Sequence, residues 1–397
     1  MTEKLVASDL FKIFGSKPER ALALIEAGKD KNAIQQETGN VVGVHSASFS
    51  VNAGEIFVVM GLSGSGKSTL VRLLNRLIEP TAGSVMIDGE DITKMGKNAL
   101  IEVRRRKISM VFQSFALLPN RTVLSNVCFG LEVAGVPAAE QTRRAMESIE
   151  AVGLAPYAQS LPDELSGGMR QRVGLARALA TDPEILLMDE AFSALDPLIR
   201  TEMQDELLRL QREHARTIVF ITHDLDEAMR IGDRIAIMEG GAIVQIGTPE
   251  EIVQKPANDY VRSFFYGVDV TRVFTAGDAA RRNLVTVIER PGVGIRAAID
   301  RLDEHDRDYG LVIDRDRRVQ GMVTTDTLRE ELKRSAEPRY ANAFVEGCAP
   351  IRNDTPLADL IGPVAESRYP VPVIDDKGRY VGAISKTTLL KLLDRGA

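Results

Sequence analysis

The fold of the first part of this chain is decided by the stretch Gly61-Leu-Ser-Gly-Ser-Gly66-Lys67-Ser68-Thr69. Its spaced glycines and the following Lys-Ser pair match the phosphate-loop pattern. A short apolar run, Ile56–Met60, precedes the loop, and an apolar pattern at helical spacing, 70–78, follows it. Because strand, glycine loop and helix is the context that phosphate binding requires, this order favours a nucleotide site over a Gly-Ser turn without a ligand.

Each position of the loop has an expected role. The glycines allow backbone N–H groups to surround phosphate oxygens. Lys67 is placed to reach the β- and γ-phosphates of a nucleotide, and the Ser68 hydroxyl is placed to bind Mg²⁺. The residues expected to bind the nucleotide here are Gly61, Ser63, Gly64, Ser65, Gly66, Lys67, Ser68 and Thr69.

Length and composition describe a soluble protein with several domains. The 397 residues predict two or three domains, and a net charge of −6 does not suggest a nucleic-acid partner. No apolar run approaches the roughly 20 residues that span a bilayer, and the N-terminus lacks the apolar core of a signal peptide. We therefore expect a cytoplasmic protein in which Cys128 and Cys348 are ordinary thiols.

Residues 40–250 alternate strand-like and helix-like segments, which predicts an α/β domain with a mainly parallel sheet. A basic run, Arg104–Lys107, ends a polar helical segment and is interpreted as a solvated helix end in preference to an anion-binding patch. The expected strands are Ile56–Met60, Ile108–Phe112, Ile185–Asp189, Ile218–Thr222 and Arg234–Met238.

After Pro256 the pattern changes to two weak repeats of about 55 residues. Each repeat reads as a helix, an apolar strand, a polar turn, a second strand and a second helix. The strands of the first are expected at 309–314 and 319–324, and those of the second at 369–375 and 380–385. Because each copy alone would bury little apolar surface, we expect the two to pack as a pair.

An apolar run from Ile185 ends in two carboxylates, Asp189 and Glu190. Carboxylates at this end of a strand lie beside the phosphate loop in a parallel sheet. Asp189 is therefore expected to hold Mg²⁺, and Glu190 to accept a proton from the attacking water. Two solvated acids at a strand end are the alternative.

Three further signals surround this pair. Ser166, Gly167 and Gly168 begin a helix and offer a second set of N–H donors for an anion. A second set makes sense when two copies of the chain face each other head to tail. Gln113 and His223 each follow a predicted strand, where an amide is expected to contact Mg²⁺ or water and an imidazole to contact the γ-phosphate.

Together these residues resemble the ATP-binding-cassette (ABC) ATPases over about residues 5–265. The phosphate loop corresponds to Walker A, and five further family motifs follow in the same order. The signature has Met169 where the family most often has Gln, which leaves the backbone donors unchanged. These motifs are the Q-loop at Gln113, the signature at Leu165–Met169, Walker B at Ile185–Glu190, the D-loop at Ser193–Asp196 and the switch histidine His223.

The chain is most similar to one subfamily, the ATPase subunits of glycine betaine/proline importers. The similarity rests on five stretches, on the segment inserted before Walker A and on a C-terminal pair of cystathionine-β-synthase (CBS) modules. The five stretches are 62–68, 72–80, 111–117, 189–200 and 223–233. The resemblance implies an ATPase domain at 1–268 with an insertion at 16–38 and a helical subdomain at 115–165, a linker at 269–277, and CBS modules at 278–338 and 339–397.

The resemblance also implies the mechanism and the partners. A homodimer would sandwich ATP and Mg²⁺ between the Walker A of one copy and Ser166–Gly168 of the other, with Asp196 at the same interface. Two integral-membrane permease subunits would bind near Gln113 and 114–119, on the cytoplasmic face of the plasma membrane. A substrate-binding protein outside the membrane would deliver the osmoprotectant. A soluble ABC ATPase and a nucleotide sensor without transport are the alternatives.

Two assignments within this resemblance have alternatives of their own. The family stacks an aromatic residue on adenine, and Phe14 is expected to do so here, with a core role as the alternative. The CBS pair is expected to regulate transport by sensing ionic strength through anionic lipid, or by binding a nucleotide. The Asp that holds ribose in ligand-binding CBS copies is replaced by Thr327 and Thr388, so a packing module is the alternative.

Overall fold

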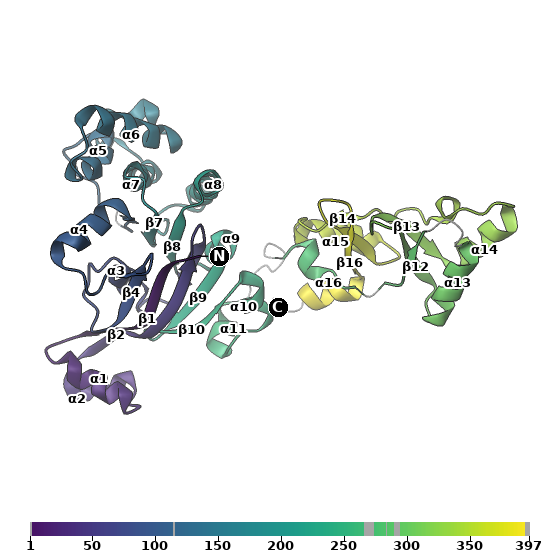
Figure 1. Ribbon diagram of the computed structural model, residues 1–397, viewed down its shortest axis with the longest axis horizontal. Helices are drawn as coiled ribbons and strands as arrows, with labels where there is room; N and C mark the ends of the chain where they lie inside the picture. The colour runs from purple at the N-terminus through teal and green to yellow at the C-terminus, as the bar shows by residue number, and fades with distance from the viewer. Residues whose placement is uncertain (1, 114–115, 266–273, 283, 290–293, 394–397) are drawn as a thin grey trace. The chain divides into compact units, whose positions relative to one another are not determined.

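The computed structural model describes residues 2–113, 116–265, 274–282, 284–289 and 294–393, and it divides the chain into two compact units (Figure 1). These are Met1–Arg262 and Ser263–Ala397, and each is described by itself. The expected domain boundary at 268 and the residues 269–273 of the expected linker lie outside the described residues. Phe274 is buried and is followed by α12 (Ala276–Ala279), so this part of the expected linker belongs to the second unit.

A six-stranded sheet forms the centre of the first unit, and all its neighbouring strands are parallel except the pair of β9 and β10. Every residue of β3, β7 and β8 is buried, which explains their continuous apolar sequences. The predicted α/β fold is confirmed. In spatial order the strands are β10 (Ala242–Gly247), β9 (Arg234–Glu239), β3 (Ile56–Met60), β8 (Thr217–Thr222), β7 (Ile185–Asp189) and β6 (Ile108–Val111).

A second, antiparallel sheet contributes to the core of this unit. Its order is β2 (Val41–Asn52), β1 (Glu3–Phe14), β4 (Ala82–Ile87) and β5 (Glu90–Asp91). The core joins the sheets, as in the stacked rings of Phe49 and Phe57, whose centroids lie 5.1 Å apart. The inserted segment is a hairpin of α1 (Pro18–Glu26) and α2 (Lys31–Thr38), which has a small core of its own with residues of β1 and β2.

The basic run Arg104–Lys107 agrees with the expected solvated helix end at the exposed Arg105 and Arg106, but not at Arg104. It closes α4 (Lys97–Arg106), and the Arg104 guanidinium donates to the carbonyl oxygens of Asn75 and Arg76. These carbonyls follow the end of α3 (Lys67–Leu74), where the last helical carbonyl groups lack partners within the helix. Arg104 therefore joins α4 to α3, a contact that local sequence does not reveal.

The remaining helices of the first unit form two groups. The first group is α5 (Val123–Val133), α6 (Ala138–Ala151) and α7 (Gly167–Ala180), which pack on one another (Figure 1). Two short 3₁₀ turns, Ala155–Tyr157 and Pro162–Glu164, lie between α6 and α7 in the sequence. The others follow the strands of the parallel sheet or end the unit. They are α8 (Pro197–His214), α9 (Leu225–Ile231), α10 (Pro249–Gln254) and α11 (Asp259–Ser263).

The second unit consists of two three-stranded sheets that repeat the same order of elements. In each, a short strand is parallel to the first strand of an antiparallel pair, and a helix separates them in the sequence. Leu311 and Met322 of the first copy pack with Tyr380 and Ala383 of the second in one cluster, so the repeats share a core. The elements are β11 (Thr286–Ile288), α13 (Ile295–Glu304), β12 (Tyr309–Ile313), β13 (Val319–Thr324), α14 (Thr325–Arg334), η4 (Tyr340–Ala343), β14 (Ile351–Arg352), α15 (Leu357–Glu366), β15 (Val371–Ile374), β16 (Tyr380–Ile384) and α16 (Lys386–Leu393).

Candidate active site

The phosphate loop connects β3 to α3 and needs its glycines. Gly61, Gly64 and Gly66 have φ angles of 155°, 79° and 101°, a region that favours glycine. A Cβ at Gly61 would lie 2.2 Å from the Met238 carbonyl oxygen, and one at Gly66 would lie 2.3 Å from that of Gly43. A Cβ at Gly64 would meet no atom within 4 Å. The loop is therefore pressed against backbone at both ends, while its middle faces open space.

The polar groups of this loop fit a bound phosphate. The Lys67 ammonium is buried and donates to the carbonyl oxygens of Gly61 and Leu62 at 2.8 and 3.0 Å. Burial lowers the pKa of Lys67, and the carboxylates of Glu190 and Asp189 oppose this shift. The Ser65 hydroxyl is buried, and within the described residues it has no hydrogen-bond partner. The loop thus supplies the Lys67 ammonium as a charged donor and the Ser65 hydroxyl as a donor without a partner among the described residues.

Asp189, the last residue of β7, lies against the start of α3. Its carboxylate accepts a 2.8 Å hydrogen bond from the Ser68 hydroxyl, and the Arg72 guanidinium lies 3.3 Å away. Arg72 was not among the residues predicted for the site. The signal was present, because Arg72 follows Ser68 by four residues and therefore lies on the same face of the helix.

The carboxylate of Glu190 is the centre of the cluster. Its oxygens lie 3.0 Å from the Gln113 amide nitrogen, 3.6 Å from His223 Nδ1 and 3.8 Å from Lys67 Nζ. Gln113 and His223 follow β6 and β8, the two neighbours of β7, and carboxyl ends of parallel strands meet at one edge. Glu190 itself has a φ of 46°, a left-handed conformation that is strained for a residue with a side chain.

The other predicted residues of the cassette lie at helix starts. Ser166 caps α7 by accepting from the Met169 N–H, and Asp196 caps α8 by accepting from the Ile199 N–H. A Cβ at Gly168 would lie 2.5 Å from a methyl group of Ile199, so the two helix starts are packed together. Within the described residues, no hydrogen bond joins either start to the phosphate loop. In the same described residues, no hydrogen bond joins Ser166, Gly168 or Asp196 to the carboxylate of Glu190.

Phe14 ends β1, and 41% of its surface is exposed. Its ring lies against Gly43, where a Cβ would come within 2.7 Å of it, and the Lys12 ammonium lies 5.2 Å from its centroid. The Gly43 carbonyl in turn lies beside Gly66 of the phosphate loop. An exposed aromatic face is thus placed one backbone segment away from the loop.

Tyr260 of α11 was also not predicted for the site. Its hydroxyl accepts a 3.4 Å hydrogen bond from the Leu62 N–H of the phosphate loop and donates to the Met238 carbonyl oxygen at 3.3 Å. No sequence signal could have found it, because almost 200 residues separate it from the loop and no pattern relates them.

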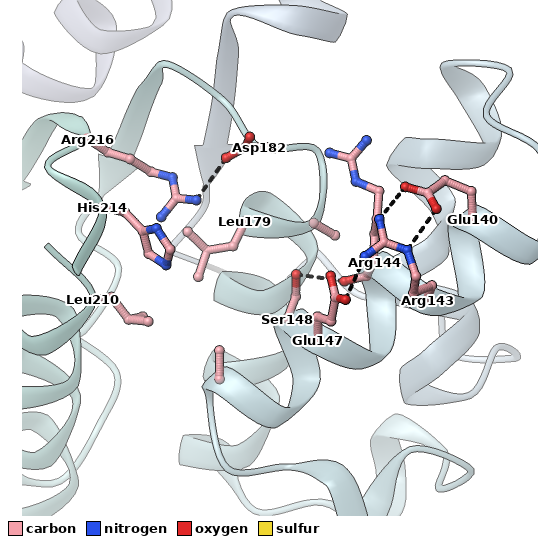
Figure 2. A pocket seen from close by; sticks show the side chains of 12 residues that line it. Glu140, Arg143, Arg144, Glu147, Ser148, Leu179, Asp182, Leu210, His214 and Arg216 are labelled. Atoms are coloured by element: carbon pink, nitrogen blue, oxygen red, sulfur yellow. Dashed lines mark hydrogen bonds and ion pairs between the residues drawn. The ribbon is translucent and has the colours of Figure 1, made fainter.

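A pocket of about 450 Å³ lies elsewhere, between α6 and the ends of α7 and α8 (Figure 2). Its charged side chains largely neutralise one another, since Arg143 pairs with Glu140 and Glu147, and Arg216 pairs with Asp182. The pocket shares no residue with the cluster around Glu190.

Comparison with known proteins decides the family. A model described as "ABC transporter" matches residues 44–193, and one described as "CBS domain" matches residues 348–395. The chain is 57% identical over 396 residues to the glycine betaine/proline betaine transport system ATP-binding protein ProV of Salmonella typhimurium, covering 100% of this chain and 98% of that protein. The chain belongs to the ATP-binding subunits of ABC transporters.

Other relatives of this ABC subunit agree. It is 48% identical over 390 residues to the glycine betaine/carnitine transport ATP-binding protein GbuA of Listeria monocytogenes, covering 98% of this chain and 97% of that one. A dimeric, post-hydrolysis ATP-binding cassette solved with ADP and Pi is 30% identical, with a TM-score of 0.52, and covers 62% of this chain and 98% of its own. The predicted cassette fold, ATP-binding activity and C-terminal CBS domain are confirmed.

Proposed function

We propose that this ABC subunit hydrolyses ATP to drive an importer of glycine betaine/proline-type osmoprotectants. The observation that carries the proposal is the Glu190 carboxylate, which lies beside a complete phosphate loop and contacts Gln113 and His223. A protein that only sensed nucleotide would not need this arrangement. The substrate class follows from similarity along the whole chain to ProV, whose name states glycine betaine/proline betaine transport.

The cluster suggests how hydrolysis proceeds. Glu190 accepts a proton from a water aligned with the γ-phosphate, and the contacts with Gln113 and His223 hold its carboxylate in place. Lys67 leaves its contacts with loop carbonyls and binds the β- and γ-phosphates. The residues suited to hold Mg²⁺ are Ser68, Asp189 and Gln113, of which Ser68 and Asp189 are already in contact. Mg²⁺ would neutralise charge on the phosphate oxygens.

The site needs a second copy of the chain. Within the described residues, the start of α7 at Ser166, Gly167 and Gly168 makes no hydrogen bond with the phosphate loop or the Glu190 carboxylate, and a head-to-tail partner would bring its N–H groups to the γ-phosphate. Asp196 at the start of α8 belongs to the same interface because Ile199 packs against Gly168. The dimeric cassette solved with ADP and Pi supports this homodimer.

A groove of about 660 Å³ offers a docking site for the permease. It lies along the edge strand β6 and is lined by α4, α5 and α7, with the exposed Phe129 and Val133 on its wall. Phe112 lines the groove, and the next residue, Gln113, donates a hydrogen bond to the carboxylate of Glu190. A permease helix that moved in the groove would therefore act on this carboxylate through Gln113. Within 114–119, residues 114–115 lie outside the described residues.

Docking of the permease in the groove along β6 would make the subunit peripheral to the membrane, on its cytoplasmic face. Within the described residues, no helix is long and apolar enough to cross a bilayer. Two permease subunits, one for each copy of the chain, would therefore supply the membrane path. A binding protein outside the membrane would supply the substrate.

We assign the CBS pair to regulation by ionic strength or by a nucleotide. Thr327 and Thr388, which stand where ligand-binding copies have Asp, are engaged in the caps of α14 and α16 with Thr324 and Ser385. Because neither hydroxyl replaces a ribose-binding carboxylate, this local arrangement favours ionic strength as the signal.

Uptake by a reconstituted importer tests the function. Liposomes with this subunit, the permease and the binding protein encoded beside it should accumulate glycine betaine and proline only when ATP is supplied on the subunit's side. Radiolabelled substrate measures the rate over a salt series. Lack of uptake with active ATP hydrolysis would contradict the proposal.

A subunit lacking residues 274–397 should hydrolyse ATP but lose the salt response, and an unchanged response would remove the regulatory role.

Phe14→Ala should weaken ATP binding, because stacking between an aromatic ring and a base contributes roughly 1–3 kcal/mol. We expect a roughly tenfold higher Kd for ATP by calorimetry, with Phe14→Trp retaining wild-type affinity because it keeps the aromatic face. Equal affinities of the wild type and Phe14→Ala would instead place Phe14 in the core alone.

A further inference from the structure

The inserted hairpin places a lysine beside the phosphate loop. Lys31 is the first residue of α2, and a Cβ built on Gly241 would lie 3.0 Å from its Nζ and 2.9 Å from the Gly43 carbonyl oxygen. The Gly241 N–H donates to the Ser65 carbonyl oxygen, and the Gly43 carbonyl oxygen lies beside Gly66. The backbone at Gly241 therefore lies next to the Lys31 ammonium and is hydrogen-bonded to the phosphate loop.

Among the residues that the structure describes, none supplies a charge that compensates this ammonium. Lys31 is half-buried, and within the part of the chain that the structure describes it makes no hydrogen bond or ion pair. Burial lowers the pKa of Lys31, and the neighbouring His45, whose own pKa is lowered by burial and by Lys31, adds no negative charge. In contrast, Lys29 of the same hairpin forms an ion pair with Glu37.

A buried cation loses hydration, and this destabilises it unless a carboxylate or a bound anion pairs with it. The anion that this ABC subunit binds at the adjoining loop is the triphosphate of ATP. The hairpin also lies in the sequence between Phe14 and Gly43, which form the aromatic edge of the same site. The position of the hairpin in the chain and the positive charge of Lys31 both favour a contact with the nucleotide.

We propose that Lys31 is a further nucleotide-binding residue, which makes the inserted hairpin part of the ATP site through contact of its ammonium with the phosphate chain. The proposal rests on ATP binding at Gly61–Thr69. It gives the insertion a role in nucleotide affinity in addition to its small apolar core.

Calorimetric titration of the full chain with ATP and Mg²⁺ tests the proposal. At low ionic strength we expect Lys31→Ala to raise the Kd about fivefold, and Lys31→Arg to restore most of the affinity. The difference should shrink at about 0.5 M salt, where the Debye length is only a few ångströms. The KM of hydrolysis should rise with the Kd while kcat changes little. Lys29→Ala, the matched control, should retain wild-type values.

Two outcomes would overturn the proposal. The first is an unchanged Kd for Lys31→Ala, including the case in which the variant only lowers the Tm of the nucleotide-free protein. The second is an equal loss of affinity in Lys29→Ala, which would reduce the effect to the overall charge of the hairpin. Failure of the wild-type chain to bind ATP at all would instead contradict the function proposed above.

Discussion

Glu190→Gln should bind ATP with near-normal affinity and lose its hydrolysis by about 10²- to 10⁴-fold, the usual contribution of a general base. Glutamine has nearly the same shape, but its amide cannot accept a proton from the attacking water. Loss of the negative charge also removes an opposing charge 3.8 Å from Lys67, which favours binding of the triphosphate. Phosphate release measures the turnover, and calorimetry measures the affinity.

The same variant should accumulate as an ATP-bound dimer, because hydrolysis is the step that reopens it. Size-exclusion chromatography with and without ATP would detect the dimer. Glu102→Gln is a suitable control, since among the described residues that exposed carboxylate pairs only with Arg105 and Arg106 on α4. Near-normal turnover by Glu190→Gln would move the role of base to another group, and His223 would be the next to replace.

Lys67→Ala should lose ATP binding by at least about 100-fold and should not support transport. A unit charge about 4 Å from a phosphate contributes roughly 4 kcal/mol at the dielectric typical of such sites. In the nucleotide-free protein, the Lys67 ammonium is held by two loop carbonyls, so the cation is already at the site before ATP arrives. Calorimetric titration with ATP and Mg²⁺ measures the loss.

Lys94→Ala is the matched control for this prediction, because 83% of that side chain is exposed and its one ion pair in the described part of the chain is with the nearby Asp91. It should retain wild-type affinity and turnover. Circular dichroism would establish that Lys67→Ala keeps its fold. A folded variant with wild-type affinity would exclude Lys67 from phosphate binding.

Much of the fold could be predicted because its signals are local. The apolar runs that become β3 and β7 have the predicted bounds, and the loop between β3 and α3 has the predicted position. Helix ends were less predictable. The helix after the loop was expected at 70–78 but stops at Leu74, and Arg104 from a distant helix binds the next carbonyls.

By itself, the sequence determined the order of the motifs, the glycine loop, the two acids at the end of β7 and the repeated C-terminal modules. These depend on the periodicity and the backbone freedom of neighbouring residues. Only the tertiary structure decided which side chains meet. Gln113 and His223 reach Glu190 because β6 and β8 flank β7, and the Lys31 ammonium lies beside Gly241, one backbone segment from the phosphate loop, because the hairpin folds back there. Strand order and the packing of distant segments set these contacts, and no local pattern records them.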